Sequence, residues 1–577
     1  MAIIEKIKEK IQEVFNPLEE KKEDIGLEDE DKSLLEKVKF RKDEAERYLN
    51  ARKLDWEKNL KLFEGDHWQV AGVTLPSYKA DIVVNKFFAA VRSLVAFETD
   101  AKPDPEVEAR IDMSDPTAGE VTASAKKVES MLDYRWDVAQ IPSILTETYY
   151  DRYIFDDGFG MYFWDIEIDD VNFEQVKPHE LMVAPGATCV EDAEYLIVQK
   201  WRNKKWFQDF YPDVDIDEIK FEEITPETQI YQGIPQLKSG EYANMAKVYH
   251  YFEDEIWVTF TDDLILEKQQ NPYWEFRSEV EQREELIKQI GEPPVDWQPI
   301  KNHLQKPEKP IIHFKGYHLG GDFYSKSLVK QVAKLNFAIN KRKCQIHDNA
   351  DNASGQWLID PSVPLDKVNM ITSEPGLKIR INPSLASKVA GTPLPEQVYL
   401  DLQDTQRAFD DMMGHHEISR GAQASKRQTA REAMLLRETD ITPVRLLMRN
   451  SEVAITKLLN GWVQLMRLFY DTPHYIGKFG VSFREEAGKA LRREEIPDKL
   501  SIIIKVGSTL PTSKEQKRME YQADLARGVL DPLTYLELMN YPNPKKILQR
   551  VQNWQQGIIG EEAPPTGVPT PPQGGLK

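Results

Sequence analysis

A long amphipathic helix is the clearest element that the hydrophobic pattern predicts, and it covers residues 322–353. Its mostly apolar positions recur at alternating gaps of four and three, the spacing that gives a helix one narrow packing seam. At 1.5 Å per residue this helix would be about 48 Å long. The seam consists of Leu328, Val332, Leu335, Ile339, Arg342, Ile346, Asn349 and Ala353.

Such a helix cannot be fully buried in a monomer, because the rest of its surface is charged. Contacts repeated between copies of one chain close into a ring when the rotation between copies allows it. The pattern therefore favours a ring of identical subunits.

The segments before this helix alternate between helical and strand-like patterns, which predicts an α+β protein. We expect a charged helix over 31–66, and a strand-like run followed by a helix within 78–109 that ends before Pro103. Residues 117–157 are helical again, and 158–268 alternate like strands with a turn at Asp169–Asp170. The core positions expected in the second helical stretch are Val128, Met131, Leu132 and Trp136.

The segments after the long helix repeat this mixture. A compact strand-and-turn unit is expected at 355–383 and a helix at 395–413. A further helical pattern reaches residue 470, and Pro443 should kink it, because proline removes a backbone donor and clashes with the preceding turn. More strand is expected at 480–508 and more helix at 512–555. Buried positions expected after the kink are Leu447, Ile455, Leu458, Leu459, Trp462 and Leu465.

Composition narrows the functional classes. The 577 residues include 75 basic and 96 acidic side chains, a net charge of −21. This balance argues against a simple nucleic-acid-binding protein, although a protein that lets DNA pass without adhering to it is compatible with it. Cys189 and Cys344 lie far apart, so we expect no disulfide framework and a reducing, intracellular compartment. We expect neither a signal peptide nor a membrane span.

Basic residues are concentrated in two places. Lys326, Lys330, Lys334 and Lys341 lie along one side of the predicted long helix. Either they form a solvated face or bind an acidic neighbouring subunit, or they face a phosphate backbone. The second place is the polar segment "SRGAQASKRQ" (419–428), with Arg420, Lys426 and Arg427. It is either an ordinary connection between helices or a loop that faces a channel.

Known catalytic and metal-binding motifs are missing from the sequence. It contains neither GxxxxGK[ST] nor GxSxG. His415, His416 and Glu417 are adjacent, but Arg420 stands where HExxH needs its second histidine. A calcium loop starting at Asp348 would have alanines at its third and sixth positions. We therefore expect no enzyme activity, no cofactor and no metal site.

The succession of segments over about 40–555 resembles the portal proteins, or head-to-tail connectors, of tailed bacteriophages. "NLKLFEGDHW" (59–68) and "NKFFAAVRSLVAFETDAKPDPEVEA" (85–109) are similar to early segments of that family. Residues 158–213 are similar to its wing, with a strand pair, a "V-x-P-x-x-L" turn and a helix approaching "YP". "GGDFYSKSLVKQVAKLNFAINKRKC" (320–344) is similar to its first stem helix, including Gln331, Leu335 and Asn336.

The resemblance implies a ring, of about twelve subunits, at one vertex of the virion capsid, assembled in the host cytoplasm. Double-stranded DNA would pass through its channel during packaging and ejection. The partners would be the terminase large subunit, then head-completion or adaptor (neck) proteins, together with capsid and scaffolding proteins. A protein-only scaffold or adaptor without a DNA channel is the alternative function.

The resemblance also implies a division of the chain into an α/β wing, a long-helix stem, a small β-containing clip and a helical crown. The expected parts are an N-terminal arm (1–30), wing (31–321 and 471–510), stem helices (322–353 and 395–413), clip (354–394), tunnel loop (414–428), long kinked helix (429–470), crown (511–556) and disordered tail (557–577). The candidate DNA-channel residues are Lys330, Lys334, Lys341, Arg420, Lys426 and Arg427.

Overall fold

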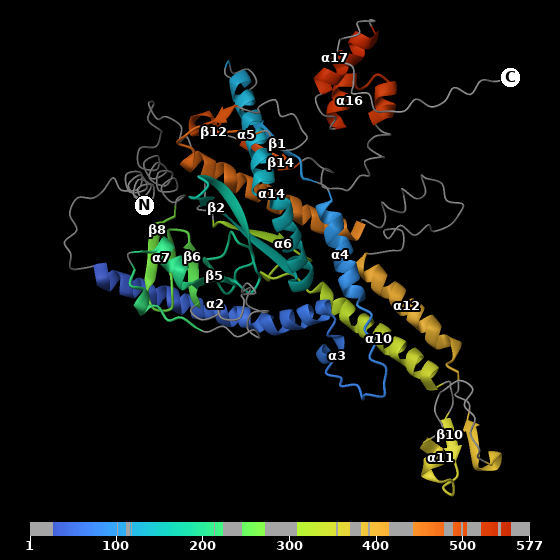
Figure 1. The fold of residues 1–577 in the computed structure, drawn as a ribbon. Helices are drawn as coiled ribbons and strands as arrows, with labels where there is room; N and C mark the ends of the chain where they lie inside the picture. The colour runs from blue at the N-terminus through green and yellow to red at the C-terminus, as the bar shows by residue number, and fades with distance from the viewer. Residues whose placement is uncertain are drawn as a thin grey trace, which may run out of the picture. The chain divides into compact units, whose positions relative to one another are not determined.

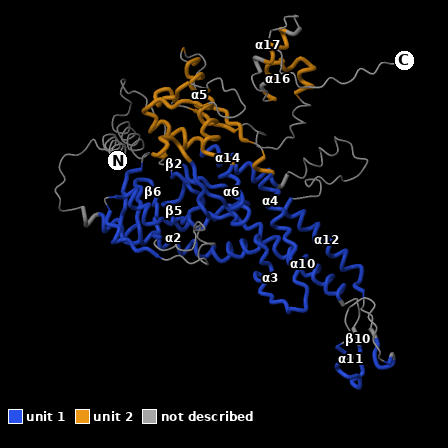
Figure 2. Tube along the Cα trace, viewed as in Figure 1, with its two compact units in different colours: residues 1–96, 143–163, 173–458 blue, residues 97–142, 164–172, 459–577 orange. Residues whose placement is uncertain are grey.

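The computed structural model combines helices with antiparallel sheets, which confirms the α+β class. It contains two compact units (Figure 2), one formed by 1–96, 143–163 and 173–458 and the other by 97–142, 164–172 and 459–577. The residues that the structure describes are 27–100, 102–110, 116, 118–212, 214–222, 245–271, 309–352, 356–369, 382–389, 393–414, 442–477, 489–497, 500–504, 521–539 and 544–555.

The core of unit 1 is a five-stranded antiparallel sheet covered by helix α2 (Leu27–Glu64) (Figure 1). Val38, Ala45, Leu49 and Trp56 of α2 are buried in one cluster with side chains of the sheet. The helix expected at 31–66 is therefore confirmed. In spatial order the strands are β4 (Leu181–Val183), β5 (Tyr195–Asn203), β6 (Met245–Glu253), β7 (Ile256–Phe260) and β8 (Ile265–Gln270).

A three-stranded sheet in the order β3-β2-β9 lies beside α6 (Ile141–Phe155) in unit 1. Its strands are β2 (Asp157–Asp165), β3 (Asp170–Val176) and β9 (Ile311–Lys315), and the ends of β2 and β3 that face their connection belong to unit 2. Gly158 permits the close packing, because a Cβ there would lie 2.5 Å from the carbonyl oxygen of Thr148. Asp169 turns the chain between β2 and β3 with a φ of 50°, where a turn was expected.

Two long helices of unit 1 carry a small β unit between them. Helices α10 (Leu328–Asn352) and α12 (Glu396–Met413) pack side by side (Figure 1). The segment between them holds β10 (Gln356–Ile359), α11 (Leu365–Asn369) and β11 (Ala386–Val389), with β10 and β11 paired antiparallel. Because this pairing brings the end of α10 and the beginning of α12 to the same place, the two helices run antiparallel. The helix expected at 395–413 is confirmed. Of the strand-and-turn unit expected at 355–383, β10 lies within the expected bounds, whereas its partner β11 begins three residues after them.

The remaining elements are shorter or divided between the units. Unit 1 also holds α3 (His67–Val70), α7 (Lys204–Phe210), most of α4 (Lys86–Thr99) and the first part of α14 (Thr442–Phe469). Unit 2 contains α5 (Ala118–Val138), the pairs β1 (Pro105–Ala109) with β14 (Leu500–Ile504) and β12 (His474–Tyr475) with β13 (Ala490–Leu491), and helices α16 (Pro532–Leu538) and α17 (Pro544–Gln555).

The core positions expected in the helices now seen as α5 and α14 are confirmed. Val128, Met131, Leu132 and Trp136 of α5 are buried. The same is true of the six positions expected on α14, which are Leu447, Ile455, Leu458, Leu459, Trp462 and Leu465.

Other expected elements also differ from the structure. The strand-like run at 81–84 pairs with no strand among the described residues; the backbone of Val84 is bound by side chains of α10 instead. Helix α10 begins at Leu328, six residues later than expected. Residues 322–324 bend and Lys326 forms a β-bridge with Tyr317, and the Ser327 hydroxyl accepts a hydrogen bond from the Lys330 amide at 3.3 Å, as an N-cap residue does. The described helix is therefore about 37 Å long.

Candidate functional site

Three of the four lysines in the predicted stripe lie on the exposed side of α10, whereas Lys326 precedes the helix and pairs with Asp322 at 3.4 Å. Lys330, Lys334 and Lys341 are all exposed, and they share one face because their spacings of four and seven residues return to the same side of a helix. Lys330 pairs with Asp55 of α2 at 2.6 Å. Lys334 and Lys341 form no ion pair with any described residue. Of these three lysines, Lys334 and Lys341 therefore have charges that can bind a partner outside the described residues.

The opposite side of α10 is buried, but its pattern differs from the predicted seam. Val329, Val332, Ile339 and Cys344 are buried there together with two asparagines, Asn336 and Asn340. Leu328, Leu335, Arg342 and Ile346 are only half-buried. The seam is shifted toward the asparagines, because these polar side chains have buried partners from elsewhere in the chain.

The main partner of the two asparagines is His67 on the short helix α3. The amide nitrogens of Asn336 and Asn340 each lie 2.8 Å from His67 Nδ1, and His67 Nε2 lies 2.9 Å from the carbonyl oxygen of Leu62. These contacts specify the neutral form with the proton on Nε2, donating to Leu62. Burial lowers the pKa of His67, consistent with a neutral ring that accepts two hydrogen bonds.

The extended segment 80–84 runs along α10 through the same side chains. The Val84 amide donates to Asn340 Oδ1 at 2.9 Å, and the Val84 carbonyl accepts from Asn336 at 3.1 Å. Farther along, the Ala80 amide donates to Asp348 Oδ1 at 2.7 Å. Sequence reasoning missed this clamp. Its only signal was the presence of two asparagines at i and i+4 within an otherwise apolar face.

The chain that leads into α10 is held by the buried carboxylate of Asp157. His313 Nε2 lies 2.8 Å from Asp157 Oδ1, the Ser325 hydroxyl donates to the same oxygen at 2.6 Å, and the Ser325 amide donates to Oδ2 at 2.7 Å. The His313 ring also packs against the rings of Phe159 and Phe323, which contact each other as well. This arrangement ties β2, β9 and the turn before α10 together.

The same three residue types form the triad of serine hydrolases, but the connectivity here is different. A catalytic histidine lies between serine and aspartate and takes the serine proton. Here Asp157 is in the middle, and the Ser325 hydroxyl donates to a carboxylate instead of a base that could activate it. All three side chains are also buried. The cluster therefore has a packing role, and the geometry gives no nucleophile.

A second carboxyl group, Asp156, lies beside a cavity of about 10 Å³, room for one water molecule. The cavity is lined in part by Arg152, Lys326 and Leu447. Asp156 has a φ of 76°, and its Oδ1 atom is buried without a hydrogen bond. Burial raises the pKa of Asp156 to about 7, against the opposing effects of Ser327 and Lys330. This group therefore changes its charge near neutral pH, close to the beginning of α10.

Helix α12 exposes a mixture of charged, polar and apolar side chains to solvent. Leu402, Phe409 and Met413 form its buried side, whereas Asp404 and Asp411 lie on the exposed side. Arg342 of α10 donates to Asp401 at 2.6 Å, and Lys86 of α4 pairs with Asp410 at 2.7 Å. These two ion pairs fix the register of α12 against the rest of unit 1.

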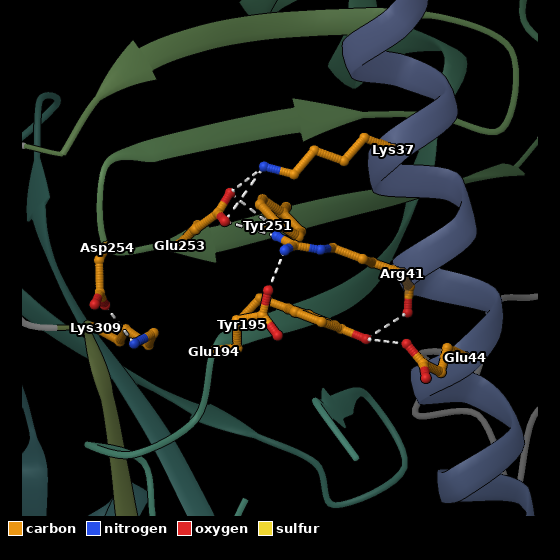
Figure 3. A network of polar contacts seen from close by, with 9 residues as sticks. All are labelled: Lys37, Arg41, Glu44, Glu194, Tyr195, Tyr251, Glu253, Asp254 and Lys309. Atoms are coloured by element: carbon orange, nitrogen blue, oxygen red, sulfur yellow. Dashed lines mark hydrogen bonds and ion pairs between the residues drawn. The ribbon is translucent and has the colours of Figure 1, made fainter. Parts of the chain in front are cut away.

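Helix α2 is held to the five-stranded sheet by a dense polar network (Figure 3). The guanidinium of Arg41 donates to Glu253 at 2.7 Å and also to Tyr251 and Glu194. The Tyr195 hydroxyl donates to the Arg41 carbonyl at 3.0 Å. Burial acts to raise the pKa of Glu253, but the hydrogen bonds from Arg41 and Lys37 outweigh it and lower that pKa. In this network, basic side chains of α2 are neutralised by acidic side chains of the same unit.

The other candidate channel residues, Arg420, Lys426 and Arg427, lie outside the described residues. So do 429–441, and the kink expected at Pro443 therefore stays a prediction. In the described part, Pro443 is the second residue of α14, a position where the missing amide does not interrupt the helical hydrogen bonds.

Two general searches of the described residues give negative results. No three His, Cys, Asp or Glu side chains come together there in a group that could hold a metal ion. No helix in this part of the chain has the length and apolar character needed to cross a membrane.

The chain matches no protein-family model, and a search of curated proteins found no significantly similar sequence.

Proposed function

We propose that this protein is a portal protein that forms a ring-shaped channel for double-stranded DNA at one vertex of a phage capsid. The observation that carries the proposal is the α10–α12 pair with its small β unit. Two antiparallel helices leave the α+β part of unit 1, carry β10, α11 and β11 at their end, and keep charged faces exposed. This is the order of elements that the resemblance to the portal family implies for stem and clip.

The exposed charges suit a conduit that holds DNA loosely. Each phosphate that a protein neutralises contributes a slope of about −0.9 to the dependence of log affinity on log salt, so many contacts on every subunit would stop movement. A net charge of −21 per protomer disfavours wrapping of DNA around the outside. A small number of basic rings then supplies local and weak contacts.

The remaining parts of the proposal follow from the same family resemblance. The β10–α11–β11 unit would dock the terminase large subunit during packaging and neck or adaptor proteins afterwards. Capsid and scaffolding proteins would contact the body of the ring. The protein would be assembled in the host cytoplasm and remain in the virion.

Native mass spectrometry of the purified protein tests the ring directly. We expect one large species of about twelve subunits at micromolar concentration, and negative-stain images along its axis should show a channel wide enough for duplex DNA. A clean monomer at that concentration would contradict the proposal. A ring that is too narrow for DNA would support a protein-only scaffold instead.

The DNA-facing role of the basic loop needs a separate test. Charge reversal of Lys426 and Arg427 should reduce packaging of DNA while the ring still assembles. Normal packaging by the doubly reversed protein would show that these two residues do not face DNA.

A further inference from the structure

Helices α10 and α12 both expose charged side chains. Lys334 and Lys341 are exposed on α10 and have no ion-pair partner in the described part of the chain. The exposed side of α12 carries Asp404 and Asp411, with Arg407 between them; Arg407 lies 3.7 Å from Asp404, and both of these side chains remain 76% exposed. Carboxylates repel DNA phosphates and attract lysine side chains.

The spacing of the two charged pairs is the same. Lys334 and Lys341 are seven residues apart, and so are Asp404 and Asp411. In a helix this separation corresponds to about 10.5 Å along the axis and returns to nearly the same side. The lysine pair and the aspartate pair can therefore meet simultaneously along two antiparallel helices.

Their heights along the helix pair also agree. The Arg342–Asp401 hydrogen bond marks one common level of α10 and α12. Lys341 lies one residue before Arg342, and Asp404 lies three residues after Asp401. Lys334 lies eight residues before Arg342, and Asp411 lies ten residues after Asp401. Because the helices are antiparallel, these offsets run in the same direction along the pair. Asp404 therefore lies two residues beyond Lys341, and Asp411 lies two residues beyond Lys334. Two residues correspond to about 3 Å, which a lysine side chain can span.

In a ring with rotational symmetry, the matching heights within one protomer also hold between neighbouring copies. A rotation that closes a ring has no translation along its axis, so groups at one height in a protomer stay at that height in the next. We propose that α12 of one protomer docks on α10 of a second copy of this chain, with Lys334 against Asp411 and Lys341 against Asp404. This inference rests on the proposed ring, with the helix pair running along its axis.

The pairing gives the lysines a role different from DNA contact. Exposed single ion pairs stabilise little, but two pairs repeated at every interface of a ring act together. Leu400, exposed on the same side of α12, adds an apolar contact beside the charges. The interface would accordingly weaken at high salt, because exposed pairs are screened.

A charge-swap experiment on the full chain tests the pairing. Mass photometry should show that Lys334→Glu with Lys341→Glu raises the protomer concentration needed for half-assembly by about tenfold or more. Asp404→Lys with Asp411→Lys should do the same. The protein carrying all four changes should assemble within about threefold of the natural protein, which also shows that the altered helices fold. Lys204→Glu with Lys205→Glu on the exposed side of α7 makes the same charge change elsewhere and should leave assembly unchanged.

The outcomes separate this inference from the proposed function. Rings unaffected by both double reversals, or not restored by the four changes together, would overturn the pairing and leave the portal proposal standing. Intact rings of the lysine double reversal that lose only DNA retention would overturn it as well, since the lysines would then face the channel. A natural protein that stays monomeric would instead overturn the portal proposal, and the pairing with it.

Discussion

The two long helices of unit 1, α2 and α10, differ in the polar groups that hold them to the rest of the unit. Charged side chains dominate on α2 and amide side chains on α10, although Lys330 and Arg342 of α10 also form ion pairs. On α2, Arg41 (Figure 3) and Lys42 bind acidic residues of the sheet region that lie more than 150 residues away in sequence: Arg41 binds Glu253 and Glu194, and Lys42 binds Asp262. On α10, uncharged amides make the buried contacts, and Lys334 and Lys341 keep their charges exposed. Both helices are long and charged, so the difference lies in where their partners are.

This difference teaches how one chain can separate folding from assembly. When ion pairs attach a helix to its own chain, its charges are neutralised there and attract other molecules only weakly. A helix attached by amides and apolar groups keeps its charges for a surface that the protomer does not provide. By this criterion α2 contributes to the fold of unit 1, whereas α10 keeps charged side chains for contacts with other molecules.

The largest effect is expected from removing the centre of the α2 network. Arg41→Ala should lower the free energy of unfolding by about 3 kcal/mol, because the largely buried Glu253 and Tyr251 would lose the guanidinium that binds them and only the more exposed Lys37 would remain beside Glu253. Urea denaturation followed by circular dichroism measures this. Lys37→Ala is the matched control: its ammonium binds the same Glu253 but is more exposed, so about 0.5 kcal/mol is expected. Equal losses for the two variants would refute a special role for Arg41.

A smaller, pH-dependent effect is expected at the beginning of α10. The pKa of Asp156 is raised to about 7 in the folded protein, so the stability it contributes is complete below its unfolded pKa and is lost as pH rises through about 7. Asp156→Asn keeps the neutral form at every pH. We expect it to match the natural protein near pH 4 and to be more stable by about 2 kcal/mol at pH 8, because the side chain is only partly exposed.

The comparison between variant and natural protein isolates this group. Asp151, with a pKa raised to about 7 by burial, and His250, with a pKa lowered to about 3 by burial, titrate in both proteins. Arg152, Lys326, Lys330 and Asp157 remain around position 156 in both as well. Thermal melts at several pH values should therefore show a difference that grows between pH 4 and pH 8. The exposed Asp209→Asn serves as the control, and a constant difference at position 156 would contradict the prediction.

Features that depend on residues close together along the chain could be predicted from the sequence, and contacts between residues far apart along the chain could not. Helix α2 and the core positions of α14, such as Trp462, follow from periodicity within a few residues, and both are confirmed. The clamp of His67 on Asn336 and Asn340 joins positions about 270 residues apart, and local patterns contain nothing about such a pair. The strand-like run at 81–84 was misassigned for the same reason. Its alternation is real, but side chains of α10 take the place of a neighbouring strand.

The lysine stripe shows the same limit at the candidate site. Spacing alone placed Lys330, Lys334 and Lys341 on one face, and the structure agrees. Spacing could not show that Asp55, 275 residues before Lys330, neutralises that lysine but neither of the others. Only the folded chain divides the stripe into one internal contact and two exposed charges.

The smallest effect should come from those two exposed charges when the protomer is studied alone. At a protein concentration low enough to keep protomers apart, Lys334→Ala and Lys341→Ala should each change the free energy of unfolding by less than about 0.5 kcal/mol. Lys330→Ala should cost more, up to about 1 kcal/mol, because it leaves Asp55 without its partner. The three variants change the same residue type on the same helix face, so denaturation curves compare them directly. If Lys334→Ala or Lys341→Ala destabilised the isolated protomer as much as Lys330→Ala, these lysines would have partners within their own chain, and α10 would not differ from α2 in the way proposed here.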